Sequence, residues 1–430
     1  ALVFASLAAR SFAELLAMFQ DGDKILGISK PEAERYSRQL LVPEVGVDGQ
    51  RKLGSVSVLV VGAGGLGSPA AMYLAGAGVK RLGLMDGDNV EASNLHRQVM
   101  HSEGRVGMSK AESGAIACKA LNSSIEVEVI KEFLSCSNAL AIVRRFDIVL
   151  DASDNVETRY MVNDACMIAG KPLVSGSALR LEGQLTVYGY HGGPCYRCIF
   201  PKPPPPDTVT SCADGGVLGP VPGVIGTLQA MEAMKVAMGM SKEEVLSGRM
   251  LLYDAAAARF RNINLRGRSV TCAVCGDLPS ISDVQSVLAG AGPHCADDAT
   301  LPPLPPQHTV CASEYAAVRR QAGSAASHVL IDVREKLQYD ICHLPGSVNI
   351  PVQRVAQSIS ELEAACEGKE EVYVLCRRGI FSNSATREVL ALAAGGAFSP
   401  ASPLSGGKIK HIEGGLQSWA RHVDDSFPVY

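Results

Sequence analysis

The sequence lacks an excess of either charge, because 40 lysines and arginines stand against 44 aspartates and glutamates and the formal net charge is −4. A chain with so little positive charge has no electrostatic basis for binding nucleic acid or an anionic membrane surface. It also lacks an apolar run long enough to span a bilayer. These shortages predict a cytoplasmic protein that binds neither nucleic acid nor membrane directly.

A secretory signal is also not evident, whereas cysteine is plentiful, with 13 residues. In a reducing compartment, cysteines bind metal or perform chemistry more often than they form disulfides. The chain has 430 residues, of which 47% are hydrophobic. Since single cores stop growing well below this length, we expect two or three domains.

The most informative stretch runs from residue 56 to residue 97, where an apolar β-branched run is broken by glycines before a helical pattern begins at Ser68. This order is typical of nucleotide-binding sites, because glycines let the backbone approach a phosphate and the helix start faces the anion. A second apolar run then reaches Asp86, at about the spacing of a ribose-binding carboxylate. The glycines are Gly62, Gly64, Gly65 and Gly67. Alone, this pattern indicates only a nucleotide and favours a dehydrogenase.

Strand and helix patterns alternate after this stretch, which indicates a mostly parallel, Rossmann-like α/β sheet with helices on both faces. The residue patterns predict helices over 110–121, 138–144 and 159–169 and strands over 125–130, 147–150 and 172–175. Asp151 to Asn155 follow one of these strands, at the edge where such sheets bind ligands. Asp154 is therefore a candidate for Mg²⁺ or substrate, and the alternative is that these residues only form a turn and cap a helix.

Two CxxC pairs lie far apart in the chain, Cys195 with Cys198 and Cys272 with Cys275. They can meet only if the fold returns the chain, and together they offer the four thiolates of a structural zinc site. A redox pair is the alternative for one of them. Between them, Cys212 stands in a Pro- and Gly-rich segment away from any apolar run, which favours a reactive thiol over an incidental one.

Proline-rich residues 291 to 306 indicate an extended linker between domains. We expect an N-terminal helix or extension over residues 1–30, a nucleotide-binding domain over 31–278, a linker over 279–306 and a second domain over 307–430.

The second domain contains an apolar strand pattern over 371–375 that runs directly into Cys376, followed by Arg377, Arg378 and Gly379. The backbone N–H groups of such a loop, together with the arginines, should stabilise an anionic sulfur. The alternative is a buried cysteine at a strand end.

Taken together, these motifs resemble known families. The GxGGLG glycines, the run DGDNVEASNLHRQ from Asp86, Lys110, Asp154-Asn155 and the CxxC pairs resemble ubiquitin-activating-type adenylyltransferases of the molybdopterin and thiamine pathways, over residues 32–278. Residues 308–430 resemble a rhodanese domain through DVRE, HLPGSVNIP and CRRGIFS. The tandem is similar to the eukaryotic enzymes that combine both domains for molybdopterin synthesis and tRNA thiolation.

The resemblance implies a role for each matching residue. ATP would lie on the glycine loop with Asp86 on the ribose, Asp154 would hold Mg²⁺, and Arg38 would reach ATP in a partner subunit, which implies a homodimer. Zinc would bind the four paired cysteines, and Arg97, Cys212 and Cys376 would be catalytic. The residues expected around the nucleotide are Gly62, Gly64, Gly65, Gly67, Asp86, Ser93, Asn94, Leu95, His96, Arg97, Lys110, Asp154, Asn155 and Arg38.

The implied function is ATP-dependent adenylation of the C-terminal glycine of a ubiquitin-like sulfur carrier, followed by sulfur transfer from a Cys376 persulfide to give a thiocarboxylate. A persulfide donor such as a cysteine desulfurase is a further expected partner. Two alternatives are an NAD- or FAD-dependent sulfur redox enzyme and a non-catalytic scaffold for a ubiquitin-like protein. Arg97 and Lys110 favour a triphosphate over a dinucleotide.

Overall fold

The computed structural model describes residues 24–25, 27–204, 215–283, 302–321 and 327–428. The chain divides into two units, residues 1–297 and 298–430, and each is described by itself. The amphipathic helix expected near the N-terminus and most of the expected linker lie outside the described residues. Within the described ranges, no helix has both the length and the apolar character needed to cross a membrane.

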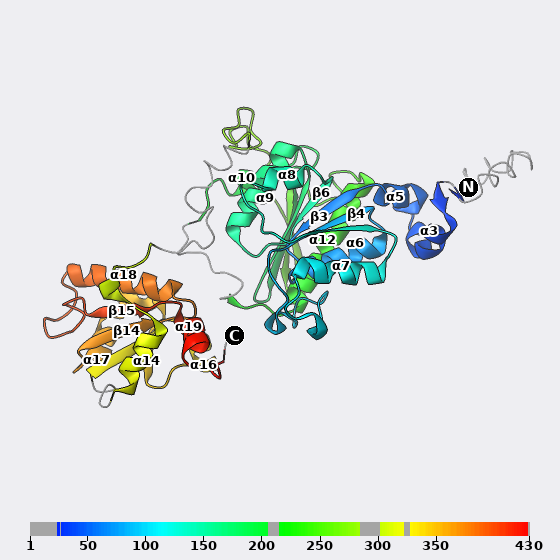
Figure 1. Cartoon of the computed structure of the whole chain (residues 1–430). Coiled ribbons are helices and arrows are strands. Elements are labelled where there is room, and N and C mark those ends of the chain that lie inside the picture. Colours follow the sequence, from blue (N-terminus) through cyan, green and yellow to red (C-terminus); the bar gives the residue numbers. More distant parts are fainter. Residues whose placement is uncertain (1–23, 26, 205–214, 284–301, 322–326, 429–430) are drawn as a thin grey trace, which may run out of the picture. The chain divides into compact units, whose positions relative to one another are not determined.

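The first unit is built on an eight-stranded sheet with the strand order β10-β9-β8-β7-β6-β3-β4-β5. Strands β3, β4 and β6 of this sheet are labelled in Figure 1. Strands β3 to β7 pair in parallel, and β8, β9 and β10 extend the sheet in antiparallel fashion. The strands are β3 Ser57–Val61, β4 Arg81–Met85, β5 Glu126–Ile130, β6 Ile148–Asp151, β7 Leu173–Leu179, β8 Glu182–Tyr188, β9 Arg249–Asp254 and β10 Arg259–Asn264. The predicted mostly parallel α/β fold is confirmed.

Both faces of this sheet are covered by helices, and each face has its own apolar core. Helices α6 Gly67–Ala77, α7 Lys110–Leu121 and α12 Pro220–Met238 share one core with Val58 and Val60 of β3. Helices α8 Ala139–Val143 and α9 Val156–Ala169 share the other with Leu59 and Val61. Because successive residues of β3 face opposite cores, this strand reads as a continuous apolar run, as expected for a central parallel strand.

Shorter elements complete the first unit. They are β1 Lys24–Ile25, β2 Ile28–Ser29, α3 Lys30–Arg35, α4 Ser37–Leu40, α5 Gly46–Leu53, α10 Tyr196–Ile199 and the 3₁₀ turns η1 Ala92–Asn94 and η2 Glu103–Arg105.

The second unit contains a parallel five-stranded sheet with the order β11-β15-β14-β12-β13, again with a core on each face. Its strands are β11 Thr309–Val310, β12 His328–Asp332, β13 Ser347–Asn349, β14 Glu371–Leu375 and β15 Ile409–Ile412. Its helices are α14 Ala312–Arg320, α16 Lys336–Ile341, α17 Ile359–Cys366, α18 Ile380–Ala394 and α19 Gly415–His422, with 3₁₀ turns η5 Pro306–His308 and η6 Val352–Gln357. The central strand β14 leads directly to Cys376 and α18.

Candidate functional site

The glycine loop connects β3 to α6 at the carboxyl edge of the first sheet. Gly62 has φ +98°, and a side chain there would place its Cβ 2.7 Å from the carbonyl oxygen of Ala152, which follows β6. Only glycine fits such a left-handed position beside another backbone without strain. The glycine loop can therefore lie close to the end of β6. The side of the loop that faces away from β6 is left accessible to a ligand.

Asp86, at the end of β4, fixes the glycine loop from the neighbouring strand. Its Oδ2 accepts a hydrogen bond from the Ala63 N–H at 2.8 Å, and its Oδ1 accepts one from the Asp88 N–H at 2.8 Å. Burial raises the pKa of Asp86, and the charge of Lys110 opposes that rise. The Asp86 carboxylate therefore stabilises the glycine loop, in addition to any contact with a ribose.

Lys110 opens α7 and brings a nearly buried ammonium group to the same edge. Its side chain is 8% exposed, and its Nζ lies 2.7 Å from Oδ2 of Asp88. A lysine so enclosed needs a counter-charge, and here Asp88 supplies it. An arriving polyphosphate would offer Lys110 a second anionic partner.

Arg97 is held in place by its own turn. Its Nη2 donates to Oδ1 of Asn94 at 2.8 Å, and its Nη1 lies 2.7 Å from Nε2 of His96. Partial burial and the charge of Arg97 lower the pKa of His96, so the imidazole is neutral and free to accept that hydrogen bond. Asn94 and His96 therefore orient the guanidinium.

A cavity at this edge collects many of the predicted residues. Its lining includes Gly62, Gly64, Gly65, Asp86, Arg97, Lys110, Asp154 and Asn155. Ser93, Asn94, Leu95, His96, Gly67 and Arg38 were also expected around the nucleotide, but they lie outside this lining. Asn94 and His96 contact the guanidinium group of Arg97. Arg38 is exposed on α4.

Some residues that line the cavity were not among the nucleotide-binding residues predicted from the sequence. Asp88 and Gln98 line the cavity and stand inside the quoted run from Asp86 to Gln98, so the sequence did carry their signal. Phe133 and Val217 line it as well, and they come from connections that no motif marks.

The polar residues after β6 divide between cavity and framework. Asp154 is exposed and lines the cavity. Asn155 lines it too and also caps α9, because its Oδ1 accepts from the Thr158 N–H at 2.8 Å. Asp151 is fully buried and accepts hydrogen bonds from Ser153 and Ser175. Asp154 is thus the carboxylate of this group that a cation in the cavity could reach.

The two CxxC pairs meet, although 73 residues separate Cys198 from Cys272 in the chain. Their four Sγ atoms lie within 4.8 Å of one another, with Cys195–Cys272 at 3.5 Å and Cys198–Cys275 at 3.4 Å. Four thiolates around Zn²⁺, at about 2.3 Å each, would be about 3.8 Å apart. The donor set therefore fits a structural zinc ion.

The surroundings of these cysteines also favour a cation. Burial and the neighbouring thiols raise the pKa of Cys195 far above its ordinary value. A backbone N–H, from Ser269, lies 3.3 Å from Sγ of Cys198. Zn²⁺ would offset the mutual repulsion of the thiolates.

Cys376 lies at the end of β14 and is 1% exposed. Its Sγ accepts a hydrogen bond from the Gly379 N–H at 3.1 Å and lies 3.5 Å from the Ser382 hydroxyl. Gly379 has φ +91°, which turns its N–H toward the sulfur. The sequence prediction placed backbone donors around this sulfur, and the Gly379 N–H is such a donor in the described part of the chain. The burial of Cys376 agrees with the alternative, a buried cysteine at a strand end.

The first residues of α19 donate hydrogen bonds to the loop that begins at Cys376. The Leu416 N–H donates to the Cys376 carbonyl at 2.9 Å, and the Gln417 N–H donates to the Arg377 carbonyl at 3.0 Å. Because the first N–H groups of a helix lack partners within it, they are available for this contact. The carbonyls of the loop thus face α19.

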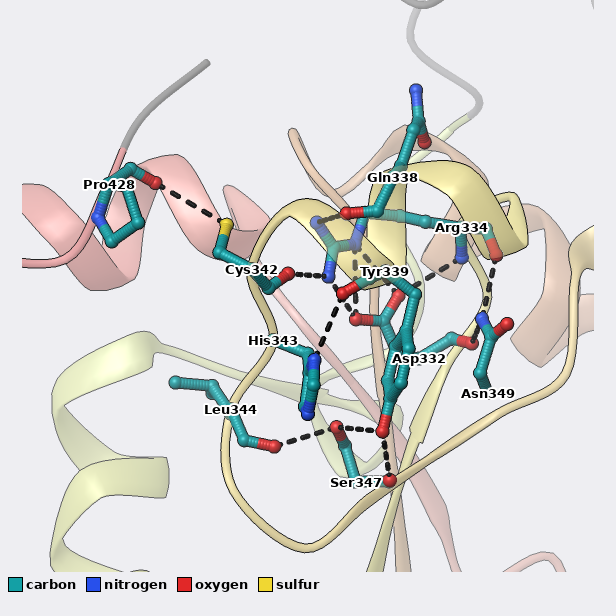
Figure 2. Close-up of polar contacts among 10 residues, drawn as sticks. All are labelled: Asp332, Arg334, Gln338, Tyr339, Cys342, His343, Leu344, Ser347, Asn349 and Pro428. Carbon is teal, nitrogen blue, oxygen red and sulfur yellow. Dashed lines mark hydrogen bonds and ion pairs between the residues drawn. The ribbon is translucent and has the colours of Figure 1, made fainter.

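A buried ion pair stabilises the adjoining turn after β12 (Figure 2). Arg334 is 2% exposed and lies between the carboxylate of Asp332 and the carbonyl oxygens of Gln338 and Cys342. Asn349 donates to the carbonyls of both Asp332 and Arg334. The DVRE motif therefore stabilises the turn that follows β12, the strand next to β14.

Cys212, the other predicted reactive thiol, lies outside the described residues.

Comparisons with known proteins agree with this arrangement. The ThiF family matches residues 36–274 and the rhodanese-like domain matches residues 314–422. A mouse adenylyltransferase and sulfurtransferase MOCS3 is 48% identical over 417 residues, which covers 94% of this chain and 88% of the relative. The MOCS3 protein of Culex quinquefasciatus is 46% identical over 413 residues, covering 94% and 91%.

Solved structures resemble the first unit. Escherichia coli MccB with ATP has 25% identity and a TM-score of 0.50, over 56% of this chain and 75% of that one. MccB with AMPCPP and MccA has 26% identity and a TM-score of 0.51, over 57% and 75%. By its sequence and by both of its domains, this chain belongs to the ThiF family and, within it, to the MOCS3-type adenylyltransferases and sulfurtransferases.

Proposed function

We propose that this chain joins the C-terminal glycine of a ubiquitin-like sulfur carrier to AMP and then exchanges the adenylate for sulfur, in molybdopterin synthesis and tRNA thiolation. One observation carries the proposal. A single chain contains both a glycine-loop cavity with Lys110 and Arg97 and a cysteine loop with a donor directed at Cys376. A nucleotide-dependent activation and a sulfur transfer therefore belong to the same catalyst.

Adenylation turns a poor electrophile into a good one. The carrier carboxylate attacks the α-phosphorus of ATP, a carboxyl–phosphate bond forms, and pyrophosphate leaves. Negative charge grows on the phosphate oxygens, and fixed cations stabilise it. Lys110 and the oriented guanidinium of Arg97 are the positive charges in the lining of the cavity.

Two further groups belong to the adenylation step in this proposal. Asp154 would hold Mg²⁺, which supplies charge neutralisation for the triphosphate and prefers one or two carboxylates plus phosphate oxygens. Arg38 is exposed and lies outside the cavity lining of its own chain, which agrees with a role in the cavity of a second copy. The working enzyme is then a homodimer.

Sulfur transfer follows in two covalent steps. The outer sulfur of a Cys376 persulfide attacks the acyl carbon, AMP leaves, and an acyl disulfide links the carrier to Cys376. Cys212 as thiolate then attacks Sγ of Cys376, so that a Cys212–Cys376 disulfide forms and the carrier leaves as a thiocarboxylate. A thiol reductant restores both cysteines. A cysteine desulfurase in the cytoplasm would reload Cys376 with sulfane sulfur.

The proposal is tested by incubating the full chain with ATP, Mg²⁺, a persulfide source and candidate carriers, and then measuring the intact mass of each carrier. Replacement of one oxygen by one sulfur would identify both the activity and the substrate. Carrier-dependent ATP–pyrophosphate exchange checks the first step alone. Binding of NAD without such exchange would instead point to a redox enzyme.

The order of the cysteine steps has its own test. Cys212→Ala should still adenylate and should stall with carrier attached to Cys376. If this variant forms thiocarboxylate over many turnovers, the role of Cys212 is wrong. If the Cys376→Ala variant, incubated with ATP and carrier, accumulates carrier on Cys212, a thioester forms first.

A further inference from the structure

The hydroxyl group of Ser382 lies at the centre of a buried polar cluster that the sulfur chemistry above does not use. Its Oγ is 3.5 Å from Sγ of Cys376, 3.1 Å from the carbonyl oxygen of Gly379 and 3.5 Å from Nδ1 of His411. Ser382 is fully buried and His411 is 5% exposed. Water therefore has little access to these contacts.

A hydroxyl has one proton and two lone pairs, so Ser382 can donate to only one of its neighbours at a time. With Cys376 as a thiol, the S–H donates to Ser382 and the Ser382 hydroxyl donates to the Gly379 carbonyl. An anionic sulfur has no proton to donate and instead needs donors, because a buried charge without hydrogen bonds is costly. The Gly379 N–H is one such donor.

His411 occupies the remaining side of the hydroxyl, from strand β15. Burial lowers the pKa of His411, Glu413 raises it and Arg387 lowers it, and the net lowering favours the neutral ring. A neutral imidazole carries one N–H, and a proton on Nδ1 can be donated to Oγ of Ser382. Arg377 and Arg378 follow Cys376 in the same loop.

We propose that Ser382 and His411 form a hydroxyl relay, in which the Ser382 hydroxyl turns from the Gly379 carbonyl to the sulfur whenever Cys376 becomes a thiolate or persulfide anion. The His411 Nδ1–H then donates to the lone pair that faces it. No covalent bond changes in this turn, and the thiol proton leaves to solvent. Ser382 and His411 are positioning residues for the sulfur step of the proposed function, on which this inference rests.

The relay predicts a change in thiol reactivity that needs neither ATP nor carrier. In the full chain, the alkylation rate of Cys376 by iodoacetamide is followed against pH by mass spectrometry of the peptide that contains it. Ser382→Ala should move the profile to higher pH, with about tenfold slower alkylation at a fixed pH below its midpoint, since one hydrogen bond to a charged group is lost. His411→Leu should move it in the same direction by less.

Conservative variants separate a relay from a packing effect. Ser382→Thr keeps the hydroxyl and His411→Asn keeps an N–H donor near the position of Nδ1, so both should retain most of the wild-type profile. Thr386→Val is the matched control, because Thr386 is a fully buried hydroxyl one turn further along α18 whose Oγ1 has no hydrogen-bond partner in the described structure. Its removal should leave the profile unchanged.

The inference is overturned if Ser382→Ala alkylates like the wild type, or if Ser382→Thr and Thr386→Val shift the profile as much as Ser382→Ala does. Should Ser382→Ala fail to fold, the comparison of His411→Leu with His411→Asn makes the same decision. A shifted alkylation profile in a protein that forms no thiocarboxylate would leave the relay standing and would refute the proposed function.

Discussion

Each unit has a loop at the carboxyl end of a central parallel strand, and the two loops share a backbone geometry but differ in their side chains. In each, a central parallel strand, β3 or β14, ends in a glycine-containing loop that starts a helix. Gly62 and Gly379 have φ values of +98° and +91°. A Cβ on either would lie 2.7 Å from backbone that follows a neighbouring strand, at Ala152 or at Gly414.

The side chains of the two loops account for the difference in chemistry. The first loop has glycines at 62, 64 and 65 and borders a cavity, so an anion at this loop would enter from outside. The second begins with Cys376, whose own sulfur occupies the position facing the Gly379 N–H. In the proposed function, one backbone geometry thus serves a diffusible phosphate in one unit and a covalently attached sulfur in the other.

The largest effect that should separate the two loops comes from Cys376→Ala. Thiocarboxylate formation should fall by more than about 10³-fold, because no other group can carry the sulfane sulfur at this loop. Carrier-dependent ATP–pyrophosphate exchange should remain within about twofold of wild type. Cys366→Ala is the control, since Cys366 is an equally buried thiol on α17 whose pKa burial raises to about 12. Loss of exchange in Cys376→Ala would show that the loops do not work separately.

Lys110→Met should have the next largest effect and should act only on the first loop. Removing one charge that stabilises a transition state costs about 10²- to 10³-fold in rate. We expect that loss in ATP–pyrophosphate exchange, with sulfur transfer from thiosulfate to cyanide unchanged. Lys119→Met tests for a general effect of charge on the same helix, because Lys119 is exposed near the other end of α7. Equal losses from both substitutions would remove Lys110 from the proposed site.

Alanine at each left-handed glycine tests whether the two backbones are equivalent. A non-glycine residue in this region costs roughly 1–2 kcal/mol, and here the close backbone contact adds to that cost. Gly62→Ala should slow pyrophosphate exchange by more than about tenfold and spare thiosulfate sulfurtransfer, and Gly379→Ala should do the reverse. Gly170→Ala is a control for left-handed strain alone, because Gly170 has φ +65° but nothing within 4 Å of an added Cβ. A Gly62→Ala enzyme with normal exchange would contradict the equivalence.

The sequence alone was sufficient for the strands and helices whose apolar period is strong. The helix predicted over 110–121 is α7, and the strand predicted over 371–375 is β14. The hairpin of β9 and β10 was not predicted, because β10 is exposed throughout and reads RFRNIN, without an apolar face. Its pairing with β9 supplies what its composition does not.

Contacts between distant segments were the other part that the sequence could not supply. It marked Asp86 as a ribose ligand by its spacing, but the hydrogen bond to the Ala63 N–H depends on how β3 and β4 pair. His411 likewise reaches Ser382 only because β15 lies beside β14. Spacing predicts the members of a motif, whereas partners from other strands require the three-dimensional arrangement.

The smallest predicted effect concerns a buried histidine that steadies the first loop, much as His411 adjoins the second. Nε2 of His101 lies 2.9 Å from the Ala63 carbonyl oxygen, and its Nδ1 lies 2.8 Å from the Ser113 hydroxyl. Burial lowers the pKa of His101, a hydrogen bond with Ala63 opposes this, and nearby Arg105 and Lys110 lower it further.

A histidine whose pKa is lower in the folded state binds fewer protons there than in the unfolded chain. Its contribution to stability is present above the unfolded pKa of about 6.5 and is lost as the pH falls from there toward the folded pKa. His101→Gln retains a donor for the Ala63 carbonyl and does not titrate. In calorimetry of the full chain between pH 5 and 7.5, this variant should show a flatter pH dependence in the unfolding of the first unit. The transition of the second unit should keep its own slope, because the pKa of His411 is lowered in the same direction. If neither transition flattens, His101 does not supply this pH dependence, and if both flatten, its effect is not confined to the first unit.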